Sequence, residues 1–154
     1  MKRILISGFE GNDNSSKILL DKIQCKNKLY LENDFRVSEQ QLKIESSKKT
    51  YDKIIIFGQK PLIKKIYIEI CAKKESEIYN TNYNYSKLEY YLTNNNYKSM
   101  ISNDAGNYLC NNIYFYALGL LKNSEIIFIH IPTLKNIEDI DNLANIFSRY
   151  VQTQ

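Results

Sequence analysis

The fold is decided by an apolar run that reads Lys53-Ile54-Ile55-Ile56-Phe57-Gly58. After Lys53 this run is continuously apolar and does not alternate, which predicts a strand that is covered on both faces. Such strands are typical of mainly parallel sheets, in which helices connect one strand to the next. Residues 125–131 have the same character and stop at Pro132, so they predict a second buried strand.

Strand-like and helix-like stretches alternate through the rest of the chain. Further strands are predicted over 4–7, 28–31, 66–72 and 97–101, a loop over 79–85, and helices over 15–24, 37–46, 87–92, 107–121 and 137–151. No repeat and no linker divides the chain. We therefore expect residues 1–154 to form one α/β domain, a three-layer α/β/α sandwich with a mostly parallel mixed central sheet.

The composition excludes several classes of protein. The chain is 44% hydrophobic, carries a formal charge of +4 and intersperses its lysines with acids, so it has no concentrated basic surface for nucleic acid. No apolar run reaches the roughly 18 residues of a membrane helix, and the apolar start is too short for a signal peptide. These features predict a cytoplasmic protein that binds neither nucleic acid nor membrane.

The cysteines and the histidine do not fit a metal site. The chain has three cysteines, which is an odd number, without CxxC spacing, and it has one histidine. A structural zinc site and a disulfide framework are both disfavoured by this pattern. No metal and no cofactor are expected.

Cys110 and His130 are the candidate catalytic residues. Cys110 follows a turn at 105–106 and falls near the start of a predicted helix, where the helix dipole lowers a thiol pKa and free N–H groups can bind an oxyanion. His130 ends a predicted strand, the place where functional groups gather in α/β sheets. The alternatives are a packed thiol for Cys110 and a core histidine with one hydrogen bond for His130.

Glu69 is the candidate third member of a catalytic triad. It lies in the alternating segment 66–72, where Ile66 and Ile68 share one face and Tyr67 and Glu69 the other. A buried carboxylate requires a partner, and an imidazolium is a suitable one. An edge carboxylate that faces water is an equal alternative. The other two cysteines, Cys25 and Cys71, have no base nearby in sequence and are expected to be structural.

Several motifs in this order resemble pyroglutamyl peptidase I, also called pyrrolidone-carboxylate peptidase, a family of cysteine peptidases. The family's nucleophile motif S-N-T-A-G-T-(F/Y)-V-C-N is similar to Ser102–Asn111, and its F-I-H-V-P is similar to Phe128–Pro132. Its opening G-F-E-P-F-G-G is matched by Gly8–Gly11, and its L-P-V-x-F faintly by Leu31–Phe35. The family's triad Glu follows the Gln of V-G-Q by ten residues, as Glu69 follows Gln59.

This resemblance implies an activity and a role for each matched residue. Cys110 would be the nucleophile, His130 its base and Glu69 the group that orients His130. The family removes an N-terminal pyroglutamate from peptides through an acyl-enzyme, without metal or cofactor. The resemblance also implies a lactam pocket that contains Phe9, Gln59, Ile78 and Tyr108, a peptide or small amide as the substrate, and compatibility with a homo-oligomer.

The chain also departs from the family pattern. It lacks the second Phe of P-F-G-G, the long P-D-N loop after Glu69 and part of the segment before Ser102. Glu77 aligns with a family Arg that lies near the active cysteine, and a Glu at that position would raise the thiol pKa. These departures leave two alternatives open: an altered amide or lactam specificity, and a non-catalytic protein that binds a peptide or partner. A third alternative is a nucleic-acid binder that uses the Tyr- and Lys-rich stretch 79–97.

Overall fold

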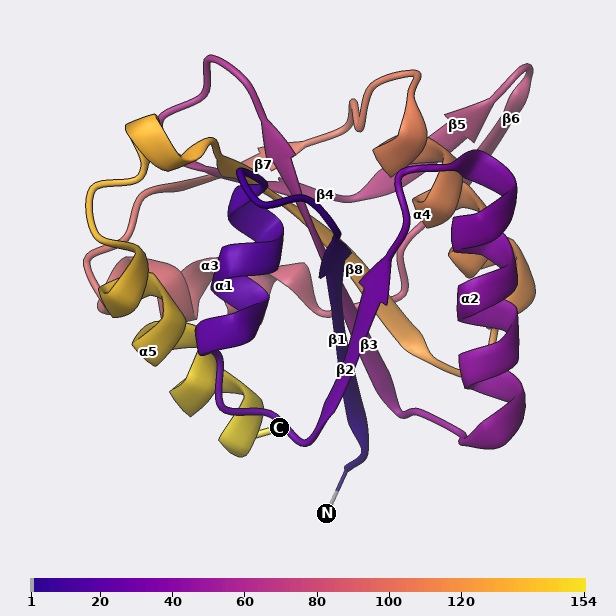
Figure 1. The fold of residues 1–154 in the computed structure, drawn as a ribbon, viewed down its shortest axis with the longest axis horizontal. Coiled ribbons are helices and arrows are strands. Elements are labelled where there is room, and N and C mark those ends of the chain that lie inside the picture. The colour runs from indigo at the N-terminus through magenta and orange to yellow at the C-terminus, as the bar shows by residue number, and fades with distance from the viewer. Residues whose placement is uncertain (1) are drawn as a thin grey trace.

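The two apolar strands predicted from the sequence lie side by side at the centre of the sheet in the computed structural model, which describes residues 2–154. They are β3 (Lys53–Lys60) and β8 (Glu125–Pro132), and they run parallel in a six-stranded sheet (Figure 1). Their register places Gly58 opposite His130. The central residues of both strands are buried, because helices cover the sheet on both sides.

The sheet is mixed and mostly parallel, as the sequence predicts. Its strand order is β2-β1-β3-β8-β4-β7. Both β1 and β2 run parallel to β3, whereas β4 runs antiparallel to β8 and parallel to β7. The four outer strands are β1 (Ile4–Phe9), β2 (Asn27–Leu31), β4 (Ile66–Glu69) and β7 (Ser99–Ser102).

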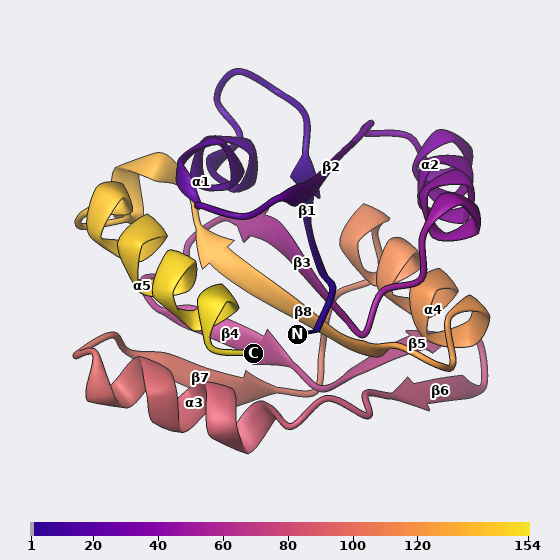
Figure 2. The same cartoon turned by 90° about the horizontal axis from the view of Figure 1, so that it is seen from below.

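Helices form the two outer layers of the sandwich (Figure 2). One buried apolar cluster joins one sheet face to α1 (Ser15–Lys22), α3 (Tyr85–Asn94) and α5 (Ile140–Gln152). A second cluster joins the opposite face to α2 (Phe35–Lys48) and α4 (Leu109–Leu120). A short 3₁₀ turn, η1 (Leu134–Asn136), connects β8 to α5. This arrangement confirms the predicted three-layer α/β fold.

Two predicted elements differ in the structure. The strand predicted over 66–72 ends at Glu69, and the chain leaves the main sheet at Ile70 to form the hairpin of β5 (Cys71–Lys74) and β6 (Glu77–Asn80). The loop prediction for 79–85 was therefore wrong at its start, because Tyr79 and Asn80 pair with β5. The sequence has no marked strand pattern there, and only the partner strand makes these residues extended.

Tyr114 ties α4 to the end of β4. Its side chain is fully buried, and its hydroxyl donates a 2.8 Å hydrogen bond to the backbone carbonyl of Glu69. A phenol whose hydroxyl is buried needs such a partner. The contact thus fixes the helix that carries Cys110 against the strand that carries Glu69.

Replacement of Tyr114 by Phe should lower the stability of the protein. The substitution leaves a buried carbonyl without this donor, and the free energy of unfolding should fall by about 1 kcal/mol. Urea unfolding followed by circular dichroism measures the change. Tyr90→Phe is the matched control, because Tyr90 is 70% exposed and should leave the midpoint unchanged. An unchanged midpoint in Tyr114→Phe would contradict the assigned role.

Candidate active site

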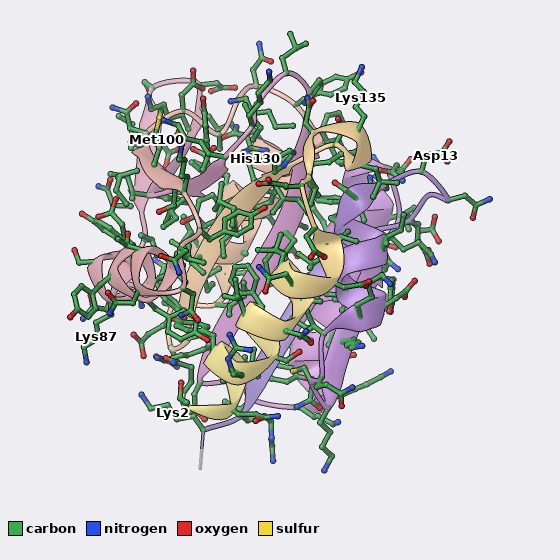
Figure 3. All side chains as sticks on the ribbon, turned by 90° about the vertical axis from the view of Figure 1, so that its left-hand side faces the viewer. Lys2, Asp13, Lys87, Met100, His130 and Lys135 are labelled. Atoms are coloured by element: carbon green, nitrogen blue, oxygen red, sulfur yellow. The ribbon has the colours of Figure 1, made fainter. Side chains whose placement is uncertain are left out.

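His130 lies near the carboxyl end of β8, on the sheet face that α4 covers. Ile126 and Phe128 belong to the apolar cluster on this face, and strand alternation places His130 on the same side. The ring is almost completely buried, with 3% exposure. Figure 3 shows His130 toward the end of the molecule that also carries Met100, away from Lys2.

Glu69 is the direct partner of His130. Its Oε2 lies 2.7 Å from Nδ1 of His130, and the whole residue has 0% exposure. The two residues meet because β4 runs antiparallel to β8, with Tyr67 opposite His130 and Glu69 opposite Phe128. The structure therefore brings the predicted carboxylate and imidazole together, and Glu69 does not face water.

This contact determines which nitrogen of His130 is available for chemistry. A carboxylate accepts a hydrogen bond, so Nδ1 carries the hydrogen and Nε2 is left unprotonated in the neutral ring. The other oxygen of Glu69, Oε1, has no hydrogen-bond partner within residues 2–154. In these residues, the Glu69 carboxylate thus makes its hydrogen bond to His130 alone.

Cys110 is the second residue of α4 and lies against β3 at the level of His130. A Cβ atom added to Gly58 would come within 2.8 Å of Sγ of Cys110 and 2.7 Å of the Phe128 ring, so only glycine leaves room for the thiol. Gly58 is itself the residue opposite His130 on β8. The thiol and the imidazole therefore share one face and one level of the sheet. No hydrogen bond joins them in the described part of the chain.

The start of α4 differs from the starts of the other α-helices in residues 2–154. Those helices have an Asn or Asp side chain as N-cap, whereas Tyr108, the N-cap of α4, makes no side-chain cap hydrogen bond. The first N–H groups of a helix have no partner within the helix. The backbone around Cys110 therefore offers free donors next to the thiol.

Asn111 fixes this helix start in place. Its side-chain amide donates to the carbonyl of Lys73 at 2.7 Å and accepts from the Lys73 N–H at 3.0 Å. This pair of hydrogen bonds satisfies backbone groups of β5 that are not used in its pairing with β6. It also anchors the residue that follows Cys110, and with it the orientation of the thiol.

The pKa of the Cys110 thiol differs from the sequence-based expectation. This pKa is raised to about 12, mainly by burial and also by the neighbouring Glu69 carboxylate, whereas the Lys60 ammonium lowers it. The sequence predicts a lowered pKa from the helix dipole alone. That prediction neglects desolvation, which the local sequence does not reveal. The thiol is therefore neutral in the ligand-free protein.

A cleft of about 440 Å³ opens beside the thiol. It is lined by Phe9, Gln59, Tyr108 and Cys110, and Phe35 forms a further aromatic wall. Gln59 accepts the Ser15 N–H through Oε1 at 3.0 Å, which leaves its amide nitrogen free to donate. The cleft thus combines aromatic surface with a few polar groups, as small-molecule sites do.

Ile78 and Glu77 lie outside this cleft. Both are exposed on β6 of the hairpin, and Ile78 is 56% exposed. Neither lines the cleft, and the charges that act on the Cys110 thiol are those of Glu69 and Lys60. The motif comparison placed Glu77 near the active cysteine and Ile78 in the lactam pocket. In the structure, neither residue lies in the cleft beside Cys110.

The sequence analysis missed several residues that shape the site. Gly58, Asn111 and Tyr114 position the three candidate catalytic groups, and Phe35 lines the cleft. Gly58 and Asn111 lie within motifs that match the family, so the sequence could have indicated that they belong to the site. Tyr114 and Phe35 depend on packing between distant segments.

Residues 2–154 contain neither a cluster of metal-ligating side chains nor a helix that could span a membrane. No group of three or more His, Cys, Asp or Glu side chains is arranged to hold a metal ion. None of the helices in this range combines the length and the apolar character needed to cross a membrane.

The raised pKa of Cys110 predicts the pH dependence of its alkylation. Only the thiolate reacts, so iodoacetamide labelling of the ligand-free protein should accelerate about tenfold per pH unit from about pH 7 to about pH 10. Mass spectrometry of the Cys110 peptide measures the rate, with the Cys25 peptide as an internal reference. A rate that levels off below about pH 8 would contradict a neutral resting thiol.

The same architecture occurs in solved structures of known enzymes. A pyrrolidone carboxyl peptidase from Fervidobacterium islandicum superposes with a TM-score of 0.86 at 17% identity, over 99% of this chain and 98% of that one. The enzyme from Thermococcus litoralis gives 0.84 at 21% identity, over 99% and 92%. Pyroglutamyl peptidase I from Bacillus amyloliquefaciens gives 0.85 at 16% identity, over 96% and 94%.

Comparison by sequence adds nothing to this result, because neither protein-family profiles nor curated protein sequences match the chain. At these identities the likeness establishes the fold. The chain has the α/β fold of the pyrrolidone carboxyl peptidases.

Proposed function

We propose that this protein is a cysteine peptidase that removes an N-terminal pyroglutamyl residue from peptides. The observation that carries the proposal is the buried Glu69–His130 pair at 2.7 Å, on the face and at the level where α4 presents the Cys110 thiol. A nucleophile, a base and a group that orients the base are the parts that covalent amide hydrolysis requires. The shared fold and the matched motifs support the same activity.

In the proposed first step, Cys110 attacks the carbonyl carbon of the pyroglutamyl residue. Nε2 of His130 takes the thiol proton as the sulfur–carbon bond forms, and the Glu69 carboxylate stabilises the resulting imidazolium. Free N–H groups at the start of α4 donate to the oxyanion. Because the resting thiol is neutral, its proton has to be transferred to His130 in the course of this step.

In the following steps the tetrahedral intermediate collapses and the acyl-enzyme is hydrolysed. The carbon–nitrogen bond breaks while the imidazolium donates its proton to the departing amine. Water then attacks the thioester, with His130 again as the base, and releases pyroglutamate and the free thiol. No metal or cofactor is needed for this chemistry.

The cleft beside Cys110 is the proposed site for the lactam ring. Phe9, Phe35 and Tyr108 supply aromatic surface for a flat, uncharged ring, and the free amide nitrogen of Gln59 can donate to the lactam carbonyl.

The chain has three free cysteines, and a thiol nucleophile requires reducing conditions. A cytoplasmic location belongs to the same proposal.

A second candidate is a protein that binds the same ligand without cleaving it. Two observations favour this alternative: the raised pKa of Cys110 and the lack of a Cys110–His130 hydrogen bond in the described residues. The aromatic walls also leave room for a related lactam or amide. Turnover experiments separate these candidates from the peptidase.

Hydrolysis of a pyroglutamyl aminocoumarin amide should depend on Cys110. Cys110→Ala should reduce kcat by at least about a thousandfold, because the nucleophile is lost. Cys25→Ala is the matched control and should keep the activity, since Cys25 lies at the opposite end of the sheet from the cleft. Equal turnover by wild type and Cys110→Ala would contradict the proposal. If the wild type binds the amide without turnover, the binding role is favoured.

Replacement of Glu69 by Gln should reduce kcat with little effect on KM. Gln can keep a hydrogen bond to Nδ1 but removes the charge that stabilises the imidazolium, so a loss of about a hundredfold to ten-thousandfold is expected. Glu77→Gln removes an exposed carboxylate on β6 and serves as the control. A Glu69→Gln variant that folds and retains wild-type kcat would show that Glu69 does not assist His130.

A further inference from the structure

A second hollow lies on the β4 and β7 side of the sheet, apart from the cleft that Cys110 lines. It has a volume of about 390 Å³ and is lined by Lys60, Tyr67, Met100, Ser102 and Asp104. The cleft is built over the β1 side of the sheet, whereas these residues come from the ends of β3 and β7, from β4 and from the loop after β7. We call this hollow the leaving-side groove, because its residue Lys60 follows by two positions the Gly58 that lies against the Cys110 thiol, and the proposed lactam site is a separate cleft.

The side chain of Lys60 extends across the strand that carries His130. Its Nζ lies 5.2 Å from the centre of the Tyr67 ring on β4, and β8 separates β4 from β3. Neighbouring strands are about 4.8 Å apart, so the Lys60 and Tyr67 side chains together bridge the width of β8. Lys60 follows Gly58 by two residues and therefore projects from the same face as Gly58, the residue opposite His130.

The ammonium group of Lys60 has no carboxylate partner in residues 2–154. Asp104 is the acidic residue that lines the same groove, and its Oδ1 accepts the N–H of Gly106 at 3.0 Å in the turn before α4. No ion pair links it to Lys60 in this range. Tyr67 supplies only a cation–π contact, which does not neutralise the charge. The leaving-side groove therefore contains an ammonium group that is not ion-paired, beside the exposed Asp104 carboxylate, and the charge of Lys60 acts on the Cys110 thiol and lowers its pKa.

We propose that Lys60 selects substrates that carry a carboxylate just beyond the bond attacked by Cys110. This inference rests on the proposed function. If the lactam ring occupies the cleft and Cys110 attacks its carbonyl, the rest of the peptide continues beyond Cys110, and we place it in the leaving-side groove. The carboxylate can belong to an acidic side chain of the second residue or to the free carboxyl end of a pyroglutamyl dipeptide.

Three substrates test this selection: a pyroglutamyl-aspartyl amide, pyroglutamyl-alanine with a free carboxylate, and the neutral pyroglutamyl-alanine amide. The two anionic substrates carry the carboxylate on a side chain and at the chain end, so they distinguish its two sources. Each should have a kcat/KM about threefold to fivefold above that of the neutral substrate, which is the size expected of a partly exposed ion pair. Lys60→Met should remove the preference and Lys60→Arg should keep it. Lys64→Met, an exposed lysine of the same connection, should also keep it. Equal kcat/KM values for all three in the wild type would overturn the inference.

Alkylation tests the charge without any peptidase activity. At one alkaline pH, the rates at which iodoacetate and iodoacetamide label Cys110 are compared. Their ratio cancels changes in the thiol pKa and reports attraction of the anionic reagent. The ratio should fall about threefold or more in Lys60→Met, but not in Lys64→Met, and high salt should abolish the difference. An unchanged ratio overturns the role of Lys60. If no pyroglutamyl substrate is cleaved, the proposed function fails, whereas this ratio still decides whether Lys60 attracts an anion at Cys110.

Discussion

The buried contact between Glu69 and His130 is the constraint on which the rest of the site depends. A carboxylate with no exposed surface is costly to bury, and here an imidazole offsets that cost at 2.7 Å. The contact depends on the register between the antiparallel strands β4 and β8, which puts Glu69 and His130 on one face. It also leaves Nε2 as the ring nitrogen that can accept a proton. One hydrogen bond thus links the strand topology to the chemistry.

The remaining elements bring a thiol to that nitrogen. Gly58 leaves space for Cys110 on the strand next to His130, Asn111 anchors the helix start to β5, and Tyr114 joins α4 to the backbone of Glu69. The helix begins without a side-chain cap, which keeps N–H donors available beside the thiol. The same enclosure raises the thiol pKa, so the thiol proton has to be transferred to His130 in the course of the reaction. Lys60, in the leaving-side groove, adds a positive charge. We propose that this charge selects a leaving peptide that carries a carboxylate.

The sequence predicts the architecture well because apolar runs such as 53–58 and 125–131 specify buried parallel strands by themselves. It also indicates Glu69, Cys110 and His130, but only the structure shows that Glu69 meets His130, since this contact depends on strand order. The hairpin at 71–80 was missed because pairing, not propensity, makes it extended. The elevated thiol pKa and the position of Lys60 follow from three-dimensional enclosure, which no local pattern contains.

The pairing of Glu69 with Nδ1 can be tested through the tautomer of His130. His130 is the only histidine in the chain, so long-range ¹H–¹⁵N spectra of the imidazole contain one ring system to assign. In the neutral ring, we expect a hydrogen on Nδ1, shifted downfield by its bond to the Glu69 carboxylate, and an unprotonated Nε2. In Glu69→Ala this downfield signal should be lost. A hydrogen on Nε2 in the wild-type neutral ring would contradict the account, because the nitrogen assigned as the base for Cys110 would then be occupied.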